Sequence, residues 1–212
     1  VNWIVTNDVS RLGHTQGLYT VMLRPNAGIV DDLITYKMGD EEFFIVYNAA
    51  NRDKDFNWLK ENSEGFDVEL TDISDGIAMI AVQGPKAVET LQKITEEDLS
   101  GVERFSIAEI TVSGLRCMAA RTGYTGEDGF EVFVMDCPVE APEKALKIWN
   151  DLVEAGAVPC GLGSRDSLRL EAGLNLYGND IDDDTNPLDA RLRWVVKFKK
   201  EGGFIGIEAL KA

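Results

Sequence analysis

Short apolar stretches separated by turn-forming residues fill the N-terminal third of the chain. Turn signals stand between them at Arg24–Gly28 and Gly39-Asp40. This order is typical of antiparallel strands joined one after the other. We predict strands over 17–22, 29–38 and 43–48. A helix is predicted to follow over 53–61, because Phe56 and Leu59 are at helical spacing.

The rest of the chain repeats this mixture of elements. Strands are predicted over 66–70, 77–82, 107–112, 115–124 and 130–135. Helices are predicted over 84–93 and 142–155, and a short one from Ser164 as its N-cap to Gly173. Strands and helices do not alternate strictly, which favours the α+β class over doubly wound α/β. A change of composition near 72–76 indicates an internal boundary.

Composition and charge narrow the function classes. Hydrophobic residues make up 44% of the 212 positions, which is enough for a folded core. The 37 acidic and 21 basic residues give a formal net charge of −16, which argues against nucleic-acid and membrane-surface binding. No apolar run is long enough for a membrane span, and no secretion signal is visible. The acidity fits a halophilic source or an ordinary soluble protein.

Few residues are available for metal or triad chemistry. The three cysteines, Cys117, Cys137 and Cys160, are odd in number and far apart, so we expect reduced thiols. His14 is the only histidine, which excludes a site of several histidines within this chain. No G-x-S-x-G motif accompanies it, so we interpret His14 as a loop residue.

Two stretches resemble the start of a ligand-binding motif but lack a required residue at a later position. Gly161-Leu162-Gly163 begins like a dinucleotide-binding fingerprint, but Asp166 occupies the place of the third glycine. The acidic run from Asp180 to Asp184 begins like a calcium loop. Thr185 stands where that loop needs glycine, and Arg191 where it needs glutamate. We therefore expect a solvated acidic loop at 180–184.

Asp31 and Asp32 lie next to each other on a predicted strand. Strict alternation would put Val30, Asp32, Ile34 and Tyr36 on one face, and Ile29, Asp31, Leu33 and Thr35 on the other. One aspartate then lies among aliphatic side chains whichever face is buried, and that is costly unless the carboxyl is paired, protonated or used. The alternative is an edge strand whose polar side carries aspartate for solubility.

The stretch from Arg121 to Glu131 combines glycine, aromatic and charged residues. Its glycines permit close approach of a ligand, Tyr124 offers a stacking face, and Glu131 can accept from amide-like N–H groups. On spacing alone, a glycine-rich hairpin turn without function is the favoured explanation of the same residues.

Five motifs together resemble the aminomethyltransferase family, the T-protein of the glycine cleavage system. They are GIVDDL at 28–33, YNAANRDKDFNWL at 47–59, RTGYTGEDGFE at 121–131, CGLGSRDSLRLEAGL at 160–174 and YGNDIDDDTNP at 177–187. The motifs stand in family order over nearly the whole chain. By this resemblance the chain is expected to be an internal piece that lacks an N-terminal segment and a C-terminal β-rich domain.

The resemblance implies an activity and partners. Aminomethyltransferase moves the aminomethyl carbon from the lipoyl arm of H-protein to tetrahydrofolate, and ammonia is released. Tetrahydrofolate and lipoylated H-protein are therefore the expected partners, with no metal, nucleic acid or membrane. A cytoplasmic location is favoured, or the mitochondrial matrix for a eukaryotic source.

The resemblance also assigns site residues and domains. Asp32 matches the key carboxylate, and Asp31 is expected to be its outward neighbour. The residues expected to line the folate site are Tyr19, Asp32, Tyr36, Tyr124, Glu131 and Arg165. The implied fold is α+β with mixed or antiparallel sheets. Its parts are a ferredoxin-like domain over 1–72, a second α+β domain over 73–178 and a linker over 179–212.

Two relatives of the family remain alternatives. One is a folate-dependent demethylase that acts on a sulfonium or N-methyl substrate. It would share the pterin site and differ at the methyl-donor pocket. The other is a non-catalytic folate-binding protein of iron–sulfur assembly. Such proteins carry a KGCYxGQ-type cysteine motif, and the comparable stretch here, 172–180, has no cysteine.

Overall fold

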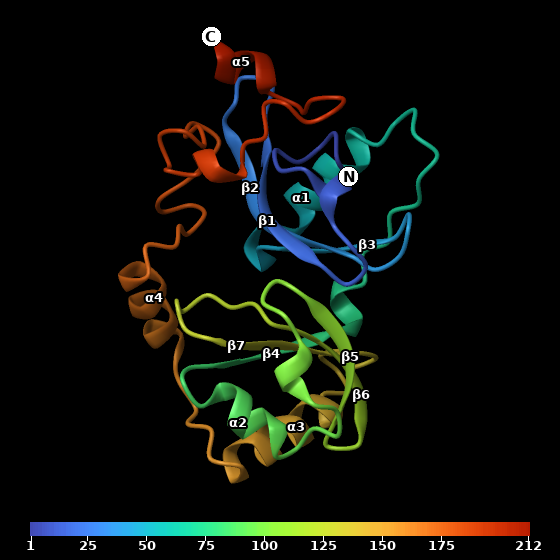
Figure 1. Cartoon of the computed structure of the whole chain (residues 1–212), viewed down its shortest axis with the longest axis vertical. Coiled ribbons are helices and arrows are strands. Elements are labelled where there is room, and N and C mark those ends of the chain that lie inside the picture. The colour runs from blue at the N-terminus through green and yellow to red at the C-terminus, as the bar shows by residue number, and fades with distance from the viewer. The chain divides into compact units, whose positions relative to one another are not determined.

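A computed structural model describes all residues, 1–212, as two compact units. Unit 1 combines Val1–Thr71 with Asn175–Ala212, and unit 2 is Asp72–Leu174. Unit 2 is therefore inserted between two segments of unit 1, and residues 175–212 form the returning segment of unit 1. The α+β class is confirmed, since both units hold antiparallel sheets and helices (Figure 1).

Unit 1 is built on a three-stranded antiparallel sheet. The strands β1 (Gly17–Leu23), β2 (Ile29–Lys37) and β3 (Phe43–Tyr47) lie in sequence order, as the turn signals predict. The helix α1 (Arg52–Glu61) follows a short 3-10 turn at Ala49–Asn51. Sequence-ordered pairing needs only the short turns that the glycines and Pro25 supply.

A β-bulge at Val30 changes which side chains share a face of β2. Met22 is paired with Asp31 and Leu23 with Ile29, so Val30 has no partner on β1. The extra residue puts Ile29 on the face of Asp32 and leaves Val30 with Asp31. Strict alternation is therefore wrong for Ile29 and Val30, although it holds from Asp31 onward.

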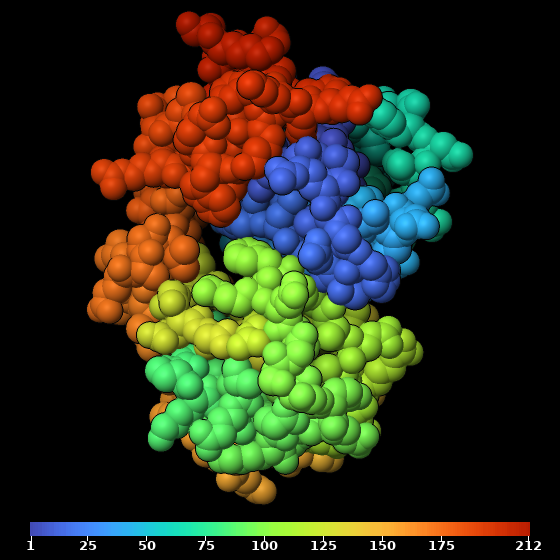
Figure 2. All heavy atoms as spheres, in the orientation of Figure 1, coloured from blue at the N-terminus to red at the C-terminus, as the bar shows by residue number.

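The two faces of this sheet pack against different parts of unit 1. The face with Val21 and Ile29 packs against residues of the returning segment, among them Ile181, Val195 and Phe204. The other face, with Met22 and Leu33, packs against the N-terminal segment and Leu59 of α1. In Figure 2 the orange-to-red C-terminal atoms lie against the blue N-terminal ones.

Two expectations about unit 1 are corrected here. The segment 179–212 is not a linker, because Val195 and Phe204 are completely or almost completely buried in a core that it shares with β1 and β2. The sheet is also not the four-stranded one of a ferredoxin-like domain, because it has three strands in sequence order. The short helix α5 (Ile207–Lys211) ends the returning segment.

Unit 2 is a four-stranded antiparallel sheet with its own core. Its strands are β4 (Ala78–Gln83), β5 (Ile107–Val112), β6 (Leu115–Ala120) and β7 (Gly129–Val134), in the order β4-β7-β6-β5. The helices α2 (Ala87–Gln92) and α3 (Glu143–Glu154) contribute Leu91, Ile148 and Leu152 to that core. The helix α4 (Leu162–Glu171) completes the unit. No helix of either unit has both the length and the apolar character that a membrane span requires.

Two local predictions are wrong. No strand forms over 66–70, where Phe66 and Val68 are 59% and 56% exposed. The Phe66 amide donates to the Ser63 oxygen and the Val68 amide to the Phe66 oxygen, so neither amide pairs with a neighbouring strand. The helix predicted to begin at Ser164 begins three residues earlier at its N-cap, Gly161. Ser164 therefore lies inside the first turn.

Candidate functional site

Asp32 and Tyr19 meet on one face of the unit 1 sheet. Tyr19 is paired with Ile34, two residues beyond Asp32 on the neighbouring strand, and this diagonal spacing is within reach of an aromatic side chain. The Tyr19 hydroxyl donates to Oδ2 of Asp32 at 3.0 Å. Trp194, from the returning segment, stacks on the Tyr19 ring with centroids 5.6 Å apart.

Asn48 links the two adjacent aspartates at the end of β3. The pairing of β2 with β3 ends at Leu33 and Tyr47, so Asn48 enters the place where the next strand pair would be. Its Nδ2 lies 3.0 Å from Oδ1 of Asp31 and 3.0 Å from Oδ1 of Asp32. A single amide therefore holds both carboxyl groups in position.

Asp31 is completely buried, which corrects the expectation that it points outward. It lies on the face of β2 that packs against the N-terminal segment and α1. Its carboxylate accepts from the backbone amide of Asn48 at 3.2 Å and from Nδ2 of Asn51 at 2.9 Å, besides Nδ2 of Asn48. These donors compensate for the water that burial removes.

A second buried carboxyl, that of Asp55, lies on the same side of the sheet as Asp31. Its side chain has no exposed surface, and no donor group lies within hydrogen-bond distance of either oxygen. The nearest cation is Lys54, whose Nζ lies 3.8 Å from Oδ1. Burial first, then a side-chain hydrogen bond with Asp31 and then the charge of Asp31, raise the pKa of Asp55 well above its ordinary value. These causes all favour the protonated form of Asp55, which can donate to the Asp31 carboxylate.

The pKa of Asp32 is raised to about 6. Burial is the largest cause, and the charge of Asp31 comes next. The hydrogen bonds from Tyr19 and Asn48 act in the opposite direction, because they stabilise the ionised form. The carboxyl of Asp32 can therefore gain and lose a proton close to neutral pH, as a general acid–base group must.

Tyr36 lies on the Asp32 face but is fully buried. It is paired with Gly17, and a Cβ added to that glycine would lie 2.4 Å from the Tyr36 ring. The ring also stacks with Phe44, with centroids 6.4 Å apart. Of the residues expected to line a folate site, Tyr36 is the least open to a ligand.

The predicted site residues of unit 2 form a second group. Arg165 of α4 lies over the Tyr124 ring, with its guanidinium carbon 5.0 Å from the centroid. Glu131 of β7 accepts from the Thr122 hydroxyl at 2.6 Å. Burial raises the pKa of Glu131, while the Thr122 bond and the charge of Arg165 lower it.

The Gln83 side chain holds the loop that carries Tyr124. Its Nε2 donates to the backbone oxygens of Thr122 at 3.0 Å and of Phe130 at 3.2 Å. A Cβ on Gly123 would lie 1.8 Å from Oε1 of Gln83, so a larger residue there would have to displace the Gln83 amide from this bridge. The glycines of this motif thus have a structural reason besides any contact with a ligand.

The structure groups the six predicted residues by unit. Tyr19 and Asp32 are in contact in unit 1, and Tyr124 and Arg165 are in contact in unit 2. Sequence reasoning missed Asn48 and Trp194. The available signal for Asn48 was an asparagine as the last residue of a predicted apolar strand. No cluster of three or more metal-ligating side chains occurs among residues 1–212.

Comparisons with known proteins agree on one family. The GCVT N-terminal domain family matches residues 1–200. An aminomethyltransferase of a Thermoanaerobacter species is 47% identical over 98% of this chain and 56% of its own length. The aminomethyltransferase of Thermosipho melanesiensis is 46% identical over 100% of this chain and 56% of its own length. The chain thus spans about half the length of these relatives.

A solved structure gives the same result for the fold. The glycine cleavage system aminomethyltransferase T from Bartonella henselae superposes with a TM-score of 0.87 and 33% sequence identity. The match covers 99% of this chain and 56% of that one. Sequence and fold thus agree over nearly all of the residues, and the chain belongs to the GCVT N-terminal domain family.

Proposed function

We propose that this chain provides the folate-binding and proton-transferring part of a glycine cleavage system aminomethyltransferase. The relatives in the family carry that name. The observation that supports the proposal most strongly is the setting of Asp32. Its carboxyl is partly buried, has two side-chain donors in contact, and has a pKa of about 6.

Each unit by itself offers groups that suit part of a reduced folate. Asp32 in unit 1 is a carboxyl that can accept from N–H groups of a pterin ring, and Glu131 in unit 2 is another. The second oxygen of Glu131 remains for a ligand after Oε2 has accepted from Thr122. Arg165, already over the Tyr124 ring, can bind a carbonyl or carboxylate. The side chains of Tyr19 and Tyr124 provide aromatic faces. On these grounds we assign tetrahydrofolate as the acceptor of the one-carbon unit.

Asp32 is assigned the proton transfer. Tetrahydrofolate gives up two protons, one from N5 and one from N10, as both nitrogens bond to the one-carbon unit. The C–N bond to ammonia and the C–S bond to the lipoyl arm break, and the departing ammonia and thiolate each take up one proton. Asp32 can accept a proton from a folate nitrogen and return it to a leaving group, since its pKa of about 6 lies near neutral pH. Tyr19 and Asn48 orient the carboxyl through their hydrogen bonds. Tyr36 supports the same face of the sheet from a buried position.

The donor in this proposal is the aminomethyl group on the lipoyl arm of H-protein. A folate-dependent demethylase would present the same acceptor residues to a different donor. The test supplies tetrahydrofolate with either aminomethyl-lipoyl H-protein or small N-methyl and sulfonium donors, and follows 5,10-methylenetetrahydrofolate. We expect product from the lipoyl donor alone. Product from the small donors alone would contradict the proposal.

A further inference from the structure

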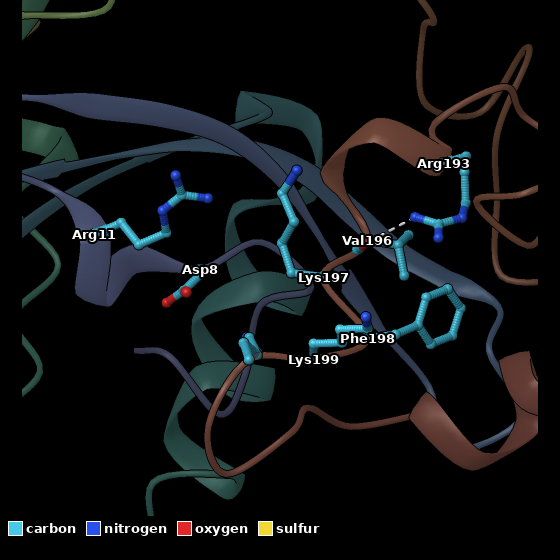
Figure 3. A pocket seen from close by; sticks show the side chains of 8 residues that line it. Asp8, Arg11, Arg193, Val196, Lys197, Phe198 and Lys199 are labelled. Carbon is cyan, nitrogen blue, oxygen red and sulfur yellow. Dashed lines mark hydrogen bonds between the residues drawn. The ribbon is translucent and has the colours of Figure 1, made fainter.

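A hollow in unit 1 is lined by basic side chains in a protein that is otherwise strongly acidic. It has a volume of about 340 Å³. Its walls come from the N-terminal turn and from the returning segment, as Figure 3 shows. The lining residues are Asp8, Arg11, Arg193, Val196, Lys197, Phe198, Lys199 and Lys200. Five of the chain's 21 basic residues therefore surround one cavity, although the net charge is −16.

Two of the lining residues, the buried Lys200 and the acidic Asp8, already form hydrogen bonds within the protein. Lys200 is 8% exposed, and its ammonium group donates to the backbone oxygens of Asn2, Val5 and Asn7. It fastens the N-terminal segment to the returning one. Asp8 accepts from the amide and the hydroxyl of Ser10, at 3.2 and 2.5 Å, which caps its own turn.

The other four cations form no ion pair with a carboxylate among residues 1–212. Arg193 donates to the Val196 oxygen at 3.0 Å, and Lys197 donates to the Trp194 oxygen at 2.6 Å. Carbonyl oxygens orient these groups without cancelling their charge. Arg11 and Lys199 are exposed, and no ion pair forms at either of them among residues 1–212.

We propose that this basic hollow binds an acidic peptide segment of a partner protein. Its positive charges are carried by flexible side chains spread along two segments, which suits a row of carboxylates better than one compact anion. The half-buried Phe198 ring, with Arg193 lying 4.9 Å from its centroid, adds an apolar contact for the peptide backbone. The acidic remainder of the surface disfavours other positions for such a ligand.

The test is a calorimetric titration of the full chain with a hexaglutamate peptide. A hexaglutamine peptide of the same length and inorganic phosphate serve as comparison ligands. We expect saturable binding of hexaglutamate alone. The affinity falls at least about tenfold when ionic strength rises from about 0.01 M to about 0.1 M, because the Debye length shrinks from about 30 Å to about 10 Å. Equal affinity for phosphate, or no binding of hexaglutamate, would overturn the proposal.

Charge-reversal variants locate the binding. We expect Lys197→Glu/Lys199→Glu to weaken hexaglutamate binding by at least about tenfold, and Arg11→Glu to weaken it as well. The control Lys60→Glu/Lys86→Glu changes the net charge equally at exposed sites outside the hollow, and binding should persist. Melting curves confirm that each variant is folded. An equal loss of affinity in the control would assign the effect to net charge and contradict the site.

Discussion

At the scale of single residues, two neighbouring aspartates lie in unlike surroundings. Asp31 is completely buried and receives donors from two asparagines, whereas Asp32 is only partly buried and titrates near neutral pH. The sequence predicts that one aspartate of the pair has aliphatic neighbours. It does not show which, because the answer depends on Asn48 and Asn51, which come from the end of the neighbouring strand and the turn after it.

The raised pKa of Asp32 has a measurable effect on stability. The folded pKa of about 6 exceeds the unfolded value of about 3.9, so the native state favours the protonated form. That contribution is complete below the unfolded pKa and is lost as the pH rises through the folded one. In Asp32→Asn nothing titrates at this position. We expect its free energy of unfolding, relative to the original chain, to be about 1 kcal/mol higher at about pH 8 than at about pH 5.

Denaturant unfolding of both proteins at the two pH values measures this difference. The asparagine keeps both contacts, because its oxygen can accept from Asn48 while its amide donates to the Tyr19 oxygen. Asp40→Asn, at an exposed turn, is the matched control and should show no such dependence. A pH-independent difference for Asp32→Asn would mean that its pKa is not raised.

The position of Asn48 predicts a shift in a pH–rate profile. Its amide stabilises the ionised form of Asp32, so Asn48→Ala should raise the pKa of Asp32 further. We expect the acidic limb of the transfer rate to move to higher pH. Asn51→Ala removes a donor from Asp31 but none from Asp32, and serves as the control. Equal shifts in both variants would remove the special role of Asn48.

At the scale of elements, the strands and the longer helices follow from hydrophobic periodicity and glycine-containing turns. The bulge at Val30 does not follow from this pattern. Ile29 and Val30 are both apolar, so the sequence does not indicate that one of them is an extra residue. Ile29, beside the bulge, also bonds to a distant part of the chain. The amide of Ile29 donates to the oxygens of Asp182 and Thr185 at 3.1 Å, so the acidic loop is bound to the start of β2.

This attachment predicts the effect of one glycine substitution. A Cβ on Gly28 would lie 1.7 Å from the backbone oxygen of Asp183, so the loop must move away from β2 in Gly28→Ala. We expect a loss of at least about 2 kcal/mol in the free energy of unfolding. Gly76→Ala is the matched control, because nothing lies within 4 Å of its added Cβ. Equal melting temperatures for the two variants would contradict the contact.

At the scale of the whole molecule, the chain builds two units, and the first is discontinuous. The boundary at Thr71 and Asp72 lies where the composition changes, so that division could be predicted. The return of 175–212 to unit 1 could not. Its buried residues, such as Ile181 and Phe204, are separated by polar turns, and this pattern is equally typical of a linker with scattered apolar residues.

The net charge of −16 predicts a salt effect on stability. Screening weakens the repulsion among the acidic residues, so the melting temperature should rise with added sodium chloride at neutral pH. Near the isoelectric point of about 4.4 the net charge vanishes, and the rise should disappear. Thermal scans at both pH values measure it. An equal rise of the melting temperature at both pH values would mean that salt acts through its exclusion from the protein surface and not through screening of the net charge.

The transfer rate of Asp32→Asn, measured beside its affinity for tetrahydrofolate, shows whether Asp32 transfers the proton. With aminomethyl-lipoyl H-protein as the donor, we expect the original chain to form 5,10-methylenetetrahydrofolate and the variant to be about 100-fold slower or worse. Tetrahydrofolate affinity, from calorimetry, should stay within a few-fold, because the hydrogen-bond partners remain. A variant that retains its rate within a few-fold would contradict the assignment of proton transfer to Asp32.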